Sequence, residues 1–169
     1  MDSGDIAWVL GSSALVLFMT PGLAFFYGGM DRRRNVLNML MMNFWCLLII
    51  PVLWVLIGYS IAGGNFDAAW FGGFDAAMLR NVGLDEDGAS QLLTIGFLGM
   101  FAVITPALIS GAVAGRMKFA AWAVFAPVWM LLVFAPVFKW VYGGWLGVRG
   151  SLDFAGGTAI HVNAGIAAL

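Results

Sequence analysis

The chain contains few charged residues. Only 10% of its 169 residues are Asp, Glu, Lys or Arg, whereas 62% are hydrophobic and the mean hydropathy is +0.94. Soluble domains carry about 25% charged residues, and a water-soluble fold this apolar would have no polar surface to expose. The composition therefore excludes a soluble domain and indicates an all-α integral membrane protein with several spans.

Cysteine is nearly absent as well. Cys46 is the one cysteine and lies in an apolar stretch, so the chain has neither a disulfide framework nor a cysteine metal site. The sequence has no GxxxxGK[ST], HExxH or CxxC pattern, and its one histidine has no nucleophile at an interpretable spacing. No basic run suggests a nucleic acid partner. We therefore expect no enzymatic activity, no cofactor and no metal.

Five charge-free apolar runs make up most of the chain. A helix that rises 1.5 Å per residue needs about 20 residues to cross a hydrocarbon core of about 30 Å. The first four runs are long enough, and the fifth stops at the last residue without a polar cap or basic anchor. We predict five transmembrane helices and interpret the chain as part of a longer polypeptide, cut within its fifth helix. The runs are 6–30, 36–66, 89–115, 119–138 and 154–169.

The links between these runs differ in charge. Residues 31–34 and 116–118 hold five of the eight basic residues, whereas the second link, 67–88, is acidic apart from Arg80. By the positive-inside rule the two basic links face the cytoplasm. The N-terminus is then outside, and the fifth helix runs inward. The acidic residues of the second link are Asp67, Asp75, Asp85, Glu86 and Asp87.

The lone histidine, His161, lies eight residues into the fifth run, on a face that also carries Gly157 and Gly165. Ionisable side chains inside membranes are usually functional, and an imidazole can hydrogen-bond a small polar solute or pass a proton. A packing role is the alternative. Asp153 directly precedes this run, where a carboxylate can cap free N–H groups. Its charge could also favour a cation at the outer mouth.

Aromatic residues form a second group of candidates. Phe97 and Phe101 are four residues apart on one face of the third helix, and Tyr142 lies at the external end of the fourth. Core packing, lipid contact or an interfacial belt is the usual explanation for such residues. An aromatic cluster at an outer mouth could instead hold a small cation against its ring faces.

Three segments resemble the ammonium transporter family (Amt/Mep/Rh). They are Met19-Thr-Pro-Gly-Leu-Ala-Phe-Phe-Tyr-Gly-Gly29, Phe101-Ala-Val-Ile-Thr105 and Asp153-Phe-Ala-Gly-Gly-Thr158 followed by His161 and Asn163. The resemblance covers essentially all 169 residues. It implies a fold of eleven transmembrane helices in two inverted halves, with residues 1–169 as the N-terminal part of the transporter domain. It also implies a homotrimer with one pore in each subunit.

The resemblance also implies roles for individual residues. Phe101 corresponds to the family's outer gate phenylalanine, with Phe97 near it, and Tyr142 to a mouth aromatic that is often tryptophan. Asp153 corresponds to the carboxylate beneath the recruitment site, and His161 to the first of two pore histidines. The second histidine, the second gate phenylalanine, a mouth serine and the tail that meets PII-class regulators would all lie beyond the last residue.

The implied function is ammonium transport in the plasma membrane for nitrogen uptake. Ammonium, and by extension methylammonium, would be held at the aromatic and acidic mouth and deprotonated, and ammonia would cross an apolar pore. Potassium has no proton to give up and would be rejected. Two alternatives are an ammonium sensor, with a signalling domain on the same fold, and a structural half-module in which His161 only packs.

Overall fold

The computed structural model describes residues 1–64, 69–83 and 86–169, without the side chain of Glu86. Asp67 and Asp85 of the acidic link therefore lie outside the described residues. Every regular element in the described part is helical, and four helical stretches there are long and apolar enough to cross a membrane. They are Ser3–Met30, Val36–Gly63, Asp87–Val113 and Phe119–Val148, and they coincide with the first four predicted spans.

The helical elements follow one another with short links. They are α1 (Ser3–Met30), α2 (Val36–Leu53), η1 (Trp54–Gly58), α3 (Tyr59–Gly63), η2 (Ala77–Leu79), α4 (Glu86–Val113), α5 (Phe119–Trp129), η3 (Met130–Phe134), α6 (Ala135–Tyr142), α7 (Trp145–Val148), η4 (Gly157–Val162) and α8 (Asn163–Ala168). Between the second and third spans, η2 is a 3₁₀ turn.

Three of these elements, η1, η3 and η4, are π-helical. Pro51 and Pro127 each lie three residues before a π segment, in α2 and α5. Proline removes a backbone donor and crowds the carbonyl four residues earlier, and the wider π turn is one way for the helix to continue. The helices also run on through Pro21 and Pro106, where the sequence suggests a kink or loosening, but there they remain α-helical.

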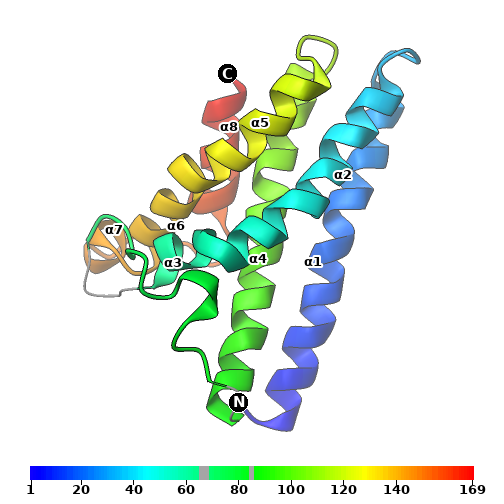
Figure 1. Cartoon of the computed structure of the whole chain (residues 1–169). Coiled ribbons are helices and arrows are strands. Elements are labelled where there is room, and N and C mark those ends of the chain that lie inside the picture. The colour runs from blue at the N-terminus through cyan, green and yellow to red at the C-terminus, as the bar shows by residue number, and fades with distance from the viewer. Residues whose placement is uncertain (65–68, 84–85) are drawn as a thin grey trace.

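The third span, α4, lies at the centre of the bundle. α4 packs against α1, α2 and α8, and α2 also packs against α5 (Figure 1). Two indole N–H groups link α2 to α5: Trp45 Nε1 donates to the Ala123 carbonyl at 3.2 Å, and Trp122 Nε1 donates to the Met42 carbonyl at 2.8 Å. Such bonds satisfy the polar edge of a ring that is otherwise buried among apolar side chains.

Both basic links lie at the same end of the bundle. The α1–α2 and α4–α5 connections and the C-terminus are together at the top of Figure 1, whereas the N-terminus lies at the bottom. The fourth helix also extends past the predicted boundary at residue 138. Lys139 lies within α6 and is only 1% exposed. The sequence suggests that this cation ends an apolar run, but helix packing buries it.

Candidate functional site

The carboxylate of Asp153 caps the start of the last helical segment. Its Oδ1 accepts from the Gly157 N–H at 2.8 Å, and its Oδ2 accepts from Thr158 at 2.8 Å and Ala159 at 2.9 Å. The predicted capping role is therefore confirmed. Partial burial on its own would raise the pKa of this carboxyl, but the N–H donors of residues 156–159 outweigh it, and the pKa lies below its usual value.

The segment that carries His161 begins as a π-helix. Gly156 has φ +80°, and a Cβ there would collide with the side chain of Ile160. Glycine alone adopts this left-handed conformation without cost. The Gly156 carbonyl then accepts from both Ile160, at 2.9 Å, and His161, at 3.0 Å. The conformation of Gly156 thus sets the orientation of the turn that carries the imidazole. The helix starts at Gly157, three residues after the predicted start.

His161 faces an open hollow and is not covered by the described chain. This inner hollow has a volume of about 550 Å³ and is lined by α1, α4 and α8, including Tyr27, Asp31 and Gly165. His161 is exposed, and a Cβ added at Gly157 or Gly165 would meet nothing within 4 Å. The room beside the imidazole that the glycine spacing predicts is present.

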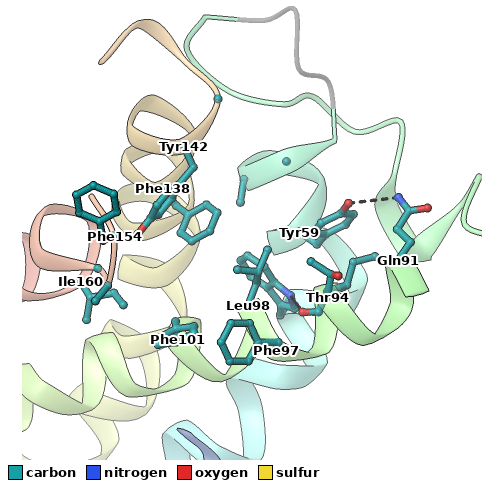
Figure 2. A pocket seen from close by; sticks show the side chains of 17 residues that line it. Tyr59, Gln91, Thr94, Phe97, Leu98, Phe101, Phe138, Tyr142, Phe154 and Ile160 are labelled. Carbon is teal, nitrogen blue, oxygen red and sulfur yellow. Dashed lines mark hydrogen bonds between the residues drawn. The ribbon is translucent and has the colours of Figure 1, made fainter. Parts of the chain in front are cut away.

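The aromatic candidates gather around a second cavity, of about 540 Å³. Phe97 and Phe101 meet edge to face, with ring centroids 5.0 Å apart, and Tyr142 packs against Phe138 at 4.6 Å (Figure 2). Phe101 comes from α4 and Tyr142 from α6, so tertiary packing brings residues of separate helices to one cavity. Because aromatic rings form a large part of the wall, a cation would contact π faces there.

Tyr142 connects this aromatic cavity with Asp153. A third hollow, of about 460 Å³, is lined by both Tyr142 and Asp153, so the tyrosine stands between the two spaces. His161 lines neither of these two spaces, but its neighbour Ile160 lines the aromatic cavity. One short segment, residues 153–161, therefore supplies the carboxylate, a residue of the aromatic cavity wall and the histidine, in that order.

Several residues of the aromatic cavity have no sequence signal. Trp54 Nε1 donates to the Ile95 carbonyl at 3.0 Å, and Gln91 Nε2 lies 3.5 Å from the Tyr59 hydroxyl. These contacts join helices whose facing residues cannot be paired from one sequence. The lining residues that sequence reasoning missed include Trp54, Tyr59, Gln91, Thr94, Phe138 and Ile160.

No metal site accompanies these cavities in the described part of the chain. Within residues 1–64, 69–83 and 86–169, no three His, Cys, Asp or Glu side chains lie close enough together to hold a metal ion. The chemistry that the site offers is that of π faces, a carboxylate and one imidazole.

Comparison with known proteins places this arrangement in a family. Residues 7–169 match the model of the Ammonium Transporter Family. The chain belongs to the ammonium transporter family. An ammonium transporter from Aquifex aeolicus is 47% identical over 174 residues, which cover all of this chain and 41% of that protein. The chain is therefore part of a family of multi-pass membrane transport proteins, and it spans about two-fifths of the length of the curated relatives it matches.

Solved structures of the family have the same helix arrangement. The crystal structure of Candida albicans Mep2 matches with a TM-score of 0.89 at 30% identity, covering 99% of this chain and 38% of that one. A protein described as a sensor Amt protein also matches with a TM-score of 0.89, over 96% of this chain and 42% of that one. It is 22% identical, so this likeness shows the shared fold alone.

Proposed function

We propose that the polypeptide to which this chain belongs transports ammonium across the plasma membrane, taking up nitrogen as ammonia through a pore lined by His161. The observation that carries the proposal is the order of three residues at the start of the last helical segment, each of which borders a different part of the site. Asp153 caps the segment, Ile160 lines the aromatic cavity, and His161 opens on the hollow beyond it. Family membership supports the same conclusion.

The geometry fits a mechanism in which ammonium gives up a proton and neutral ammonia crosses the pore separately from that proton. An ammonium ion would be recruited by the rings of Phe97, Phe101 and Tyr142 with the negative charge of Asp153 nearby, each ring contributing about 0.5–2 kcal/mol. The bare ion would lose many kcal/mol of hydration in an apolar pore. Transfer of one proton to a base leaves neutral ammonia, whose lone pair can accept a hydrogen bond from His161. An imidazole can also relay the released proton.

The complete fold that we propose has eleven transmembrane helices in two inverted halves. Residues 1–169 form its N-terminal part, with the N-terminus outside and a fifth helix that begins at η4 and runs inward. The position of both basic links at one end of the bundle supports this orientation (Figure 1). A homotrimer, a PII-class regulator on the inner face and methylammonium as a second substrate are further expectations for the whole protein.

The test is an ammonium-driven current in proteoliposomes that contain the full-length protein. We expect His161→Ala to abolish the proton-coupled current or change its stoichiometry, because the residue that bonds ammonia and relays the proton is lost. Ser13→Ala is the matched control, since Ser13 is a polar residue of a spanning helix whose hydroxyl, among the described residues, bonds only to the Val9 carbonyl four residues earlier. Unchanged current together with unchanged rejection of potassium in His161→Ala would contradict a pore role.

The sensor hypothesis makes a different prediction for the same measurement. A receptor built on this fold would bind ammonium without sustained flux and would carry a signalling domain elsewhere in the polypeptide. Wild-type protein that shows saturable binding but no current would therefore favour the sensor.

A further inference from the structure

The inner hollow contains a carboxylate that the transport scheme above does not use. Asp31 lines the hollow together with Tyr27 and His161. In the sequence, Asp31 reads as part of a basic link because three arginines follow it. In the fold it is the residue that ends α1, where its N–H donates to the Tyr27 carbonyl at 3.1 Å.

The position of the Asp31 side chain is well defined. Its Oδ1 accepts from the backbone N–H of Arg32 at 2.7 Å and from Asn35 Nδ2 at 3.3 Å. Asn35 in turn lies against the end of the α4 stretch, where Gly115 has φ +69° and a Cβ would lie 2.6 Å from Asn35 Nδ2. Contacts from two helix ends thus hold the carboxylate at the edge of the hollow.

No basic side chain pairs with the Asp31 carboxylate in the described part of the chain. Its Oδ2 is buried and accepts no hydrogen bond there, and Arg32, Arg33 and Arg34 are exposed. The carboxylate also lies at the C-terminal end of a 28-residue helix with no basic residue in its last turn. The helix dipole is negative at that end and disfavours a second negative charge. A buried polar atom without a partner calls for a specific explanation.

Oδ2 is closed to solvent, so a small cation in the hollow would not contact it but would compensate the negative charge through space. The carboxylate and the end of α1 together create a negative potential, which acts strongly where water is partly excluded. The Tyr27 ring lies in the same wall, held by a bond from its hydroxyl to the Leu108 carbonyl at 3.4 Å. Gly111 packs against this ring, where a Cβ would lie 2.8 Å from Tyr27 Cε2, whereas a Cβ at Gly165 would meet nothing within 4 Å. The hollow thus offers the negative field of a carboxylate, an aromatic ring in its wall and space beside Gly165.

We propose that Asp31 and Tyr27 form an ammonium-binding site at the end of the pore opposite Asp153. This proposal rests on the proposed function and adds a second charged site to it. During uptake the site receives the ammonium ion that re-forms after ammonia has passed His161. During efflux it is the first site that the ion meets.

The rival explanation is a basic side chain from the remainder of the polypeptide that pairs with Asp31. Such a pair would be structural, and removing the carboxylate would then lower stability and slow transport equally in both directions. A binding site predicts a directional effect, because the inner site is encountered first only by ions that leave the cytoplasmic side.

The test uses full-length protein in oriented proteoliposomes, with ammonium chloride as the probe at constant ionic strength. Apparent KM is measured for uptake and for efflux in wild type, Asp31→Asn and Asp31→Glu. Asparagine can keep the oxygen that accepts from Arg32 while removing the charge. We expect Asp31→Asn to raise the ratio of efflux KM to uptake KM about fivefold, the effect of one nearby charge at a partly open site. Asp31→Glu keeps the charge, so its ratio should stay close to the wild-type value.

Arg33→Gln is the control, because it also changes the charge of the link by one but does not line the hollow. An equal and opposite shift in Arg33→Gln would show that only the surface potential matters and would overturn the proposal. No change in the KM ratio, an equal change in both directions, or a change confined to uptake would also overturn it. A wild-type protein without ammonium current would instead contradict the proposed function, so the two failures are distinguishable. If Asp31→Asn does not fold, Asp31→Ser decides: it also removes the charge and must raise the ratio of efflux KM to uptake KM.

Discussion

Asp153 Oδ2 accepts the backbone N–H of Ala159 at 2.9 Å, two residues before His161. The carboxylate of Asp153 and the imidazole of His161 are therefore parts of one local structure. Any change that releases Asp153 also frees the turn that orients His161. A defect in transport from such a change combines an electrostatic and a structural effect, and stability measurements are needed to separate them.

Asp153 should make stability depend on pH in the acid range. The pKa of its carboxyl is lowered in the folded state, so its contribution is fully present above the unfolded value of about 3.9. It is lost as the pH falls through the folded pKa. We expect Asp153→Ala to cost about 1–2 kcal/mol near neutral pH, and the advantage of wild type over Asp153→Asn to shrink below about pH 4.

Thermal unfolding of the full-length protein in detergent, followed from pH 7 to pH 3, measures this dependence. Asp75→Asn is the control, since the exposed carboxylate of Asp75 accepts no backbone hydrogen bond within the part of the chain that the structure describes. A difference between wild type and Asp153→Asn that stays constant down to pH 3 would contradict the role of the carboxylate charge.

Gly99 should not tolerate a side chain. A Cβ there would lie 2.8 Å from Trp54 Cδ1, so Gly99→Ala has to displace the indole that donates to the Ile95 carbonyl. We expect a loss of about 1–3 kcal/mol, as is typical of overpacking. Gly96→Ala on the same helix meets nothing within 4 Å and should be neutral or slightly stabilising.

Comparison of the two alanine variants by thermal unfolding tests the close approach directly. The double variant Trp54→Phe/Gly99→Ala should show a loss smaller than the sum of the two single losses, because the side chain that clashes is smaller. If Gly99→Ala is as stable as Gly96→Ala, the close packing of α4 against Trp54 is refuted.

The indole N–H of Trp122 should stabilise the bundle. Trp122 is fully buried and bonds to the Met42 carbonyl of α2 at 2.8 Å. Trp122→Phe keeps an aromatic ring but removes the donor, and we expect a cost of about 1–2 kcal/mol, together with a small loss of packing. Trp8→Phe is the control, because Trp8 is 78% exposed. Equal melting temperatures for the two variants would argue against the cross-link.

The ring of Tyr142 should matter more for ammonium affinity than its hydroxyl. Loss of one cation–π contact predicts that Tyr142→Ala raises the apparent KM for uptake by roughly 2- to 30-fold. Tyr142→Phe retains the ring against Phe138 and should stay close to wild type. Initial rates of ammonium-driven current across a concentration series measure both values. A phenylalanine variant as impaired as the alanine variant would mean that the hydroxyl, beside the Asp153 hollow, carries the effect.

Local chemistry made part of the site predictable. Asp153 lies four residues before Gly157, within reach of the first free N–H groups of the helix, so its capping role follows from the sequence itself. The glycines beside His161 similarly indicated space on that face. These are short-range relationships, in which the geometry of one turn decides the outcome and no distant part of the chain intervenes.

The positions of other residues could not be predicted in this way. Lys139 looks like the boundary of a span, yet α6 carries it into the interior at 1% exposure. Asp31 looks like part of a charged link, yet it lines the hollow that His161 also faces. Both outcomes depend on how separate helices pack, which periodicity and composition do not specify.

The sequence by itself determined that this protein is a helical membrane protein, because a chain with 62% hydrophobic and 10% charged residues arranges them in uninterrupted apolar runs long enough to cross a membrane as helices, which satisfy their own backbone. It also determined the four long spans and the cap at Asp153. Only the tertiary structure decided that Phe101 and Tyr142 share a cavity and that Asp31 faces the hollow beside His161. Those relationships arise where helices far apart in sequence are in contact, and close packing alone sets which side chains meet there.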